Sequence, residues 1–248
     1  MSEIARRRIG ESDRPIRFDG QVAIVTGAGR GLGAAYARLI AGLGGAVVVH
    51  DAGVAQDGSG FDRSVADSVA SEIVAAGGIA AACHDNLDQA TACRHVIDFA
   101  LDRFGRIDAL VHNAGLVVFS SLEETDAALW DRMVAIGATT KMAQVGLMVG
   151  LAAELRDTGV CSNAISPVAA TRVLRRSAPE LLPELVAPGV AFLASAACTV
   201  SGRVLTAAGG RFSTVAWNES HEVNFGPSPA SVDDIAARWD DIAGTIRP

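Results

Sequence analysis

The sequence is poor in two residues that often carry chemistry: its 248 residues include one tyrosine, Tyr36, and one lysine, Lys141. The other 20 basic residues are arginines. The four cysteines stand singly and form no CxxC pair, which argues against a zinc site or a disulfide framework and is typical of reduced thiols. No metal site is therefore expected.

Long apolar runs and an excess of positive charge are also missing. No apolar run reaches the roughly 18 residues that a membrane span needs. The net charge of −7 argues against nucleic acid or an anionic membrane as a partner. The arginines at 6–8 are not followed by the apolar stretch of a secretory signal, so we expect a cytoplasmic protein. Half of the residues are hydrophobic and only 20% are charged, which excludes a long disordered chain.

Apolar runs of strand length alternate with helical patterns, which predicts βαβ units around a parallel sheet. The runs lack two-residue alternation, as expected where helices cover both faces of a sheet. We therefore predict an α/β fold with a Rossmann-type, doubly wound parallel sheet. The predicted strands are Val22–Thr26, Ala46–His50, Ile79–Cys83, Ala109–His112, Val160–Ile165 and Arg203–Ala207. The predicted helices lie near residues 31–44, 63–77, 88–104, 122–155 and 179–197.

A glycine-rich loop follows the first predicted strand. Val22–Thr26 runs into Gly27–Gly33, where a helix is expected to begin. Glycines let the backbone approach a pyrophosphate closely, and the helix directs free N–H groups and its positive end toward that anion. About 20 residues further on, Asp51 closes the second predicted strand, where a carboxylate can bind the ribose hydroxyls of a dinucleotide. This order of elements predicts a dinucleotide site.

These residues resemble the short-chain dehydrogenase/reductase family. Thr26–Gly33 matches the TGxxxGxG motif of that family, and Asn113-Ala114-Gly115 matches its NAG motif. Asn163–Pro167 with Thr171 matches the segment that follows its sixth strand. Further features resemble the subgroup of type 4 hydroxysteroid and multifunctional-enzyme dehydrogenases, namely the long loop with Asp57-Gly58 and the runs Val168–Arg172 and Pro183–Pro188.

The resemblance implies an NAD(P)-dependent oxidoreductase that interconverts hydroxyl and keto groups. The residues implied to cradle the pyrophosphate are Gly27, Arg30, Gly31, Leu32 and Gly33. Asp51 would bind the adenosine ribose, and Asp85 or Asn86 would face the adenine. The residues implied along the rest of the cofactor are Asn113, Ala114, Gly115, Val168 and Thr171, the last two at its nicotinamide half. A carboxylate at Asp51 repels a 2′-phosphate, which favours NAD over NADP, although Arg30 would soften that preference.

Three segments are predicted along the chain. Residues 1–19 are expected to form an N-terminal arm, and residues 20–210 an NAD(P)-binding Rossmann domain. Residues 211–248 are expected to form a C-terminal tail, with a short amphipathic helix near Val232–Ile242.

The catalytic set that the resemblance implies is incomplete. In the family a tyrosine donates the proton to the carbonyl oxygen, a lysine four residues later lowers its pKa and holds the nicotinamide ribose, and a serine polarises the carbonyl. Lys141 stands at the lysine position, but Gly137 stands at the tyrosine position. The nearby hydroxyls of Ser120, Ser121, Thr139 and Thr140 are far poorer acids than a phenol, and ordinary loop and capping roles suit them better.

The missing residues imply that one β–α unit of the family is absent. Such a unit needs on the order of 30 residues, and the stretch between Gly115 and Lys141 is too short to hold it. We expect one fused helix over 122–155, kinked at Gly137, and a six-stranded sheet in which Val160–Ile165 lies beside the fourth strand. Because the fused helices form the main dimer interface of the family, a homo-oligomer, either dimer or tetramer, is expected.

Tyr36 lies in the helix after the glycine loop, where it is expected to pack rather than to react. Lys141 is either the retained ribose contact or a solvated helix residue. Three functions stay open: an impaired or non-standard NAD(P)-dependent oxidoreductase acting on a lipid-like or polyketide-like hydroxyl or keto compound; a non-catalytic NAD-binding partner subunit; and a non-redox enzyme that performs elimination or cyclisation. An internal deletion in the gene would also explain the missing unit.

Overall fold

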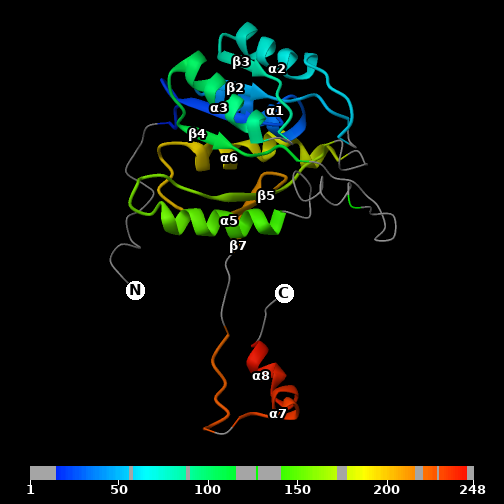
Figure 1. Cartoon of the computed structure of the whole chain (residues 1–248), viewed down its shortest axis with the longest axis vertical. Coiled ribbons are helices and arrows are strands. Elements are labelled where there is room, and N and C mark those ends of the chain that lie inside the picture. Colours follow the sequence, from blue (N-terminus) through cyan, green and yellow to red (C-terminus); the bar gives the residue numbers. More distant parts are fainter. Residues whose placement is uncertain are drawn as a thin grey trace. The chain divides into compact units, whose positions relative to one another are not determined.

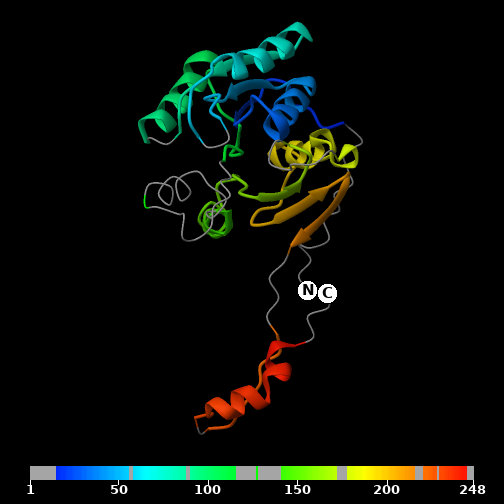
Figure 2. The ribbon, with the colours of Figure 1, turned by 90° about the vertical axis from the view of Figure 1, so that its right-hand side faces the viewer.

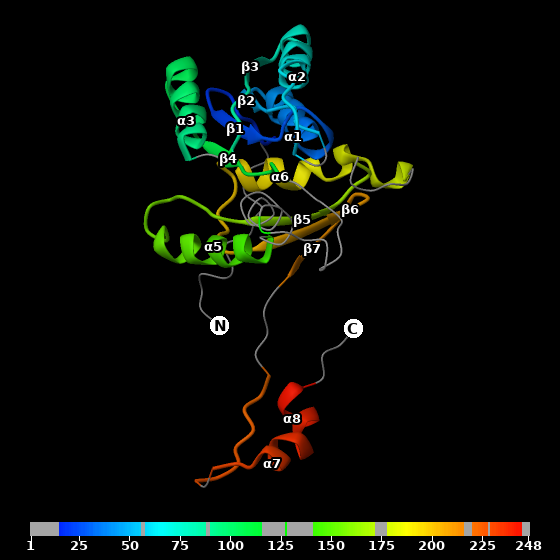
Figure 3. The same cartoon turned by 45° about the vertical axis from the view of Figure 1, so that its right-hand side comes forward.

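The computed structural model describes residues 15–55, 58–87, 90–115, 127, 141–171, 178–215, 220–227 and 229–244. Its larger sheet has the order β3-β2-β1-β4 (Figures 1 and 3; β1 is labelled in Figure 3). The strands are β1 (Val22–Thr26), β2 (Ala46–His50), β3 (Ile79–Cys83) and β4 (Ala109–Val111). All of its pairings are parallel. The carboxyl ends of the four strands therefore meet at one edge, which brings the loops after them together.

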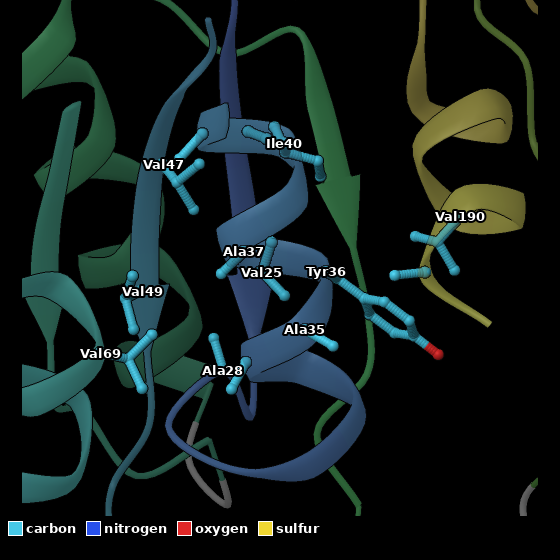
Figure 4. Close-up of a cluster of buried hydrophobic side chains, with 14 of the residues drawn as sticks. Val25, Ala28, Ala35, Tyr36, Ala37, Ile40, Val47, Val49, Val69 and Val190 are labelled. Carbon is cyan, nitrogen blue, oxygen red and sulfur yellow. The ribbon is translucent and has the colours of Figure 1, made fainter. Parts of the chain in front are cut away.

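Helices cover both faces of this sheet, and alternate strand residues face opposite sides. Val25 and Val49 pack in the core cluster that contains residues of α1 (Gly31–Gly42) and α2 (Ser64–Ala75), drawn in Figure 4. Ile24 and Val48 pack instead with residues of α3 (Ala90–Phe104) on the other face. The apolar runs that predicted covered strands are therefore explained by burial on both sides.

A second sheet of three strands has the order β5-β6-β7, formed by β5 (Ala164–Val168), β6 (Val204–Ala208) and β7 (Arg211–Val215). Strands β5 and β6 are parallel. Gly209 and Gly210 join β6 to β7 with φ of 54° and 75°, positive values that suit the tight turn of a hairpin. Helix α5 (Lys141–Glu154) runs alongside β5. Two short 3₁₀ helices, Pro179–Leu181 and Pro183–Leu185, precede α6 (Ala187–Ala194), which packs against α1 and lies between the two sheets (Figures 2 and 3).

The predicted α/β class with a parallel, helix-covered sheet is confirmed, but the expectation of six strands in one sheet is corrected. Within the described residues β5 pairs with β6 and not with β4. Residues just before β5 are bound to the start of β6: Gly202 N–H donates to Ser162 O at 2.7 Å, and Arg203 N–H donates to Asn163 Oδ1 at 3.1 Å. Pro167 has no N–H, which suits an edge strand.

Some predicted elements lie wholly or partly outside the described residues. Of the helix predicted over 122–155, the structure gives Lys141–Glu154 as α5. The predictions for Gly137, Ser120, Ser121, Thr139 and Thr140 fall outside the described residues. Most of the expected arm, residues 1–14, is also outside. None of the helices in the described part of the chain is long and apolar enough to cross a membrane.

The chain divides into two compact units, Met1–Thr214 and Val215–Pro248. The second unit contains α7 (Val232–Ala237) and α8 (Trp239–Ala243), close to the helix predicted near Val232–Ile242. Helix α7 begins with a capping box in which Ser231 and Asp234 satisfy each other's backbone N–H groups.

Candidate functional site: a glycine-lined cavity at the edge of the larger sheet

The glycine loop lies so close to neighbouring backbone that side chains would not fit. A Cβ on Gly33 would strike Gly27 O and the amide of Asn113. Gly27 has a φ of 64°, and a Cβ there would lie 2.9 Å from the Cα of Ala114. These glycines are required because the loop between β1 and α1 presses against the NAG segment after β4.

Asn113 and Thr26 fasten that loop. The Asn113 side-chain amide donates to Thr26 O at 2.9 Å and to Gly27 O at 3.1 Å. The Thr26 hydroxyl accepts from the backbone N–H groups of Asn113 and Ala114, each at 3.0 Å. The loop therefore holds its shape through the protein's own bonds, before any ligand contributes. This role of Thr26 was not predicted from the sequence, where the residue stands only as part of the motif. A hydroxyl residue that closes a strand before glycines was the available signal.

The first turn of α1 has no side-chain cap. Arg30 occupies its N-cap position but makes no side-chain capping bond, and Gly31 opens the helix with a φ of 51°. Uncapped N–H groups at a helix start, together with the positive end of its dipole, form a site for an anion. Thr171 lies against this turn, since a Cβ on Gly31 would be 3.1 Å from its methyl carbon.

Asp51 closes β2 beside the glycine loop. Its Oδ2 accepts the Gly29 N–H at 2.9 Å, and its Oδ1 accepts the Gly53 N–H at 2.8 Å. The carboxylate is thereby fixed toward the cavity side of the loop. Arg30 lies on the same side, where its guanidinium donates to Val54 O at 3.3 Å on the exposed segment after β2.

Asp85 and Asn86 follow β3 at the same edge. The Asp85 carboxylate is already engaged, because Oδ2 accepts the Cys83 thiol at 3.3 Å and Oδ1 lies 3.5 Å from His95 Nδ1. Burial raises the pKa of Cys83 to about 12, so this thiol keeps its proton and stays a donor. Both carboxylate oxygens of Asp85 therefore have partners within the protein.

One cavity of about 1460 Å³ brings the predicted residues together. Thirteen of the fourteen predicted cofactor-binding residues line it. Val168 ends β5 of the second sheet and Thr171 follows it, whereas Asp51 and Asn113 follow β2 and β4 of the first sheet. Lys141 begins α5, but its side chain lies outside the described residues, so its role stays a prediction. The same cavity is bounded by apolar side chains of α5, Leu147, Met148 and Leu151.

Tyr36 is confirmed as a packing residue. Its side chain is 2% exposed within the core cluster, and Figure 4 shows its ring extending from α1 toward Val190 of α6. Burial raises the pKa of this phenol, which disfavours any step that needs its anion.

Comparison with known proteins gives the same family in sequence and in structure. Residues 21–139 match the family model described as short chain dehydrogenase. A short-chain type dehydrogenase/reductase of Mycobacterium tuberculosis, Rv0148, is 33% identical over 90% of this chain and 93% of its own length. Peroxisomal multifunctional enzyme type 2 of Drosophila melanogaster is 32% identical over 82% of this chain, which spans 41% of that enzyme.

Among solved structures, a short chain dehydrogenase from Mycobacterium avium superposes with a TM-score of 0.78 at 29% identity, covering 93% of this chain and 96% of that one. The alignment with the M. tuberculosis protein spans 268 positions, more than the 248 residues of the whole chain. Part of that relative therefore has no counterpart here.

Proposed function

From the premise that the chain belongs to the short-chain dehydrogenase/reductase family of oxidoreductases, nearest the multifunctional-enzyme subgroup, we propose that it binds NAD(H) in the glycine-lined cavity. The observation that carries this proposal is the glycine loop, whose shape is held by hydrogen bonds within the protein. Gly27 and Gly33 leave no room for a Cβ, and the Asn113 side chain donates to Thr26 O and Gly27 O. Such a loop, followed by a helix start without a side-chain cap, suits a pyrophosphate.

We propose NAD rather than NADP as the preferred cofactor. Asp51 is held by two backbone N–H groups and keeps a negative charge where the adenosine ribose would lie. That charge repels a 2′-phosphate, and Arg30 offsets the repulsion only in part because it is bound to Val54 O on the exposed side.

We propose that hydride chemistry at this site is impaired. The bound cofactor would supply the hydride acceptor or donor, and the protein must supply a proton at the substrate oxygen. The only phenol of the chain, Tyr36, is buried in the core cluster, and a glycine stands at the tyrosine position of the motif. Lys141 would hold the nicotinamide ribose, and the substrate would be a hydroxyl or keto compound with a lipid-like or polyketide-like body, consistent with the apolar lining from α5.

The buried phenol also favours a second candidate, a non-catalytic NAD-binding subunit that pairs with another copy or an active homologue. Exposed apolar residues on α5 that do not line the cavity support oligomerisation: Met142 is 64% exposed and Val149 is 45% exposed. A non-redox reaction, elimination or cyclisation, in the same cavity is the remaining candidate.

Thermal unfolding with NAD, NADP and neither tests the proposal. A ligand at one hundred times its Kd stabilises a protein by about 2.7 kcal/mol, which raises the melting temperature measurably. We expect a rise with NAD, a smaller rise with NADP, and a smaller NAD effect in Lys141→Ala. No rise with millimolar NAD would overturn the proposal. Appearance of reduced nicotinamide with a panel of secondary alcohols then separates an enzyme from a binding subunit.

A further inference from the structure

His50 closes β2 and is almost fully enclosed, with 2% of its surface exposed. In the sheet it lies opposite Thr26 of β1 and Cys83 of β3. Its Nε2 atom is 2.7 Å from the carbonyl oxygen of Asp85. Because a carbonyl can only accept, Nε2 must carry the proton, and the neutral ring is the Nε2–H tautomer.

The other ring nitrogen explains why this tautomer is fixed. Nδ1 is buried and has no hydrogen-bond partner within the described residues. A proton on Nδ1 would be a buried donor without an acceptor, and burial lowers the pKa of the ring, so His50 stays neutral. A buried polar atom without a partner is unfavourable, and a purely apolar side chain would fill the same place without it.

The backbone and the side chain of His50 join two walls of the cavity. Its carbonyl oxygen accepts the Ala28 N–H of the glycine loop at 2.8 Å. Its ring donates to the turn after β3, whose residues Asp85 and Asn86 line the cavity. Asp51, the next residue along the chain, carries the carboxylate proposed for the ribose.

We propose that His50 is a positioning residue for the adenosine half of the dinucleotide: its Nε2–H bond fixes the Asp85–Asn86 turn relative to Asp51 and the glycine loop. This inference rests on the proposed function, because it assigns a role within the NAD(H) site. The nicotinamide half is predicted to lie toward Val168 of β5 and Thr171 after it, so His50 would act on one half of the ligand only.

Binding of ligand fragments tests the assignment. In His50→Phe, which keeps a flat ring without a donor, we expect the Kd of NAD and of ADP-ribose to rise about tenfold while that of nicotinamide mononucleotide is unchanged. In His50→Gln, whose amide can donate from a similar position, we expect the Kd of both adenosine ligands to return to within about threefold of the wild-type value. Val48→Ala, two residues earlier on the same strand face, should lower stability and leave all three Kd values unchanged.

Several results would overturn the assignment. One is an unchanged Kd of ADP-ribose in His50→Phe; another is an equal loss for nicotinamide mononucleotide, which indicates a merely structural role. If His50→Phe does not fold, histidine ¹⁵N spectra of the wild type test the assignment. We expect an Nε2–H tautomer whose resonance shifts on addition of ADP-ribose and does not shift with nicotinamide mononucleotide. An Nδ1–H tautomer, or no shift with ADP-ribose, would overturn the assignment. Wild-type protein that binds neither NAD nor ADP-ribose contradicts the proposed function itself.

Discussion

The two sheets of the larger unit differ in how completely they are buried. Every residue of β1 and four of the five in β2 are buried, whereas three of the five in β5 and all five in β7 are exposed. The first sheet has helices on both faces and holds the glycine loop. The second begins after the stretch in which the sequence predicts that a β–α unit of the family is absent. The contrast teaches that the glycine loop stands on the more completely buried of the two sheets.

The largest effect is expected from adding a methyl group within the glycine loop. In Gly33→Ala the new Cβ meets Gly27 O and the Asn113 amide, so the loop must move. We expect NAD affinity to fall at least a hundredfold and the free energy of unfolding to drop by about 2 kcal/mol. Gly42→Ala is the matched control in the same helix, since nothing lies within 4 Å of its added Cβ. It should stabilise the protein by about 0.5–1 kcal/mol and leave NAD binding unchanged.

Truncating one valine in each sheet sharpens the comparison. Val48 in β2 is 0% exposed, and Val168 in β5 is 49% exposed. We expect Val48→Ala to lower the free energy of unfolding by about 2 kcal/mol and Val168→Ala by less than about 0.5 kcal/mol, measured by urea titration. Equal losses would mean that β5 is as well buried in solution as β2.

The first three strands could be predicted residue for residue, because each is a short apolar run covered on both faces. The position of β5 could not. The apolar residues from Val160 favoured an earlier start, but Ser162 and Asn163 bind the segment before β6 instead. Where a strand begins and which strand it pairs with depend on residues far away in the sequence, so a local sequence pattern cannot predict them.

Most of the candidate site could likewise be located from the sequence, since the carboxyl ends of parallel strands meet at one edge. The contributions of Thr26 and His50 could not. Each depends on a bond to a segment far along the chain, from Thr26 to the NAG segment and from His50 to the Asp85 carbonyl.

Cofactor choice provides a smaller expected effect. Replacing the carboxylate in Asp51→Asn removes the charge that repels a 2′-phosphate. The Kd of NADP relative to that of NAD should fall about tenfold, measured by calorimetry. Glu72→Gln is the control, because that exposed carboxylate pairs with Arg38 and does not line the cavity. A ratio that is the same in Asp51→Asn and the wild type would contradict the role given to Asp51.

The smallest effect concerns the edge of the first sheet and depends on pH. The Asp108 carboxylate accepts the Val22 N–H at 2.8 Å, and its hydrogen bond with Arg106 holds its pKa below the ordinary value. A lowered pKa in the folded state adds stability above the unfolded pKa of about 3.9, and this stability is lost as pH falls through the folded pKa. Asp108→Asn should therefore lower the free energy of unfolding by at most about 1 kcal/mol at pH 7. In urea titrations the difference from wild type should shrink below about pH 4; a difference that grows with acid would contradict this.

Isothermal titration calorimetry of the wild-type protein with NAD, run beside Gly33→Ala, tests most directly whether the glycine loop and the cavity that it lines bind a dinucleotide. We predict saturable binding at one site per chain in the wild type and no measurable heat in Gly33→Ala. Absence of binding to the wild type at millimolar NAD, or equal binding to both proteins, would contradict the account.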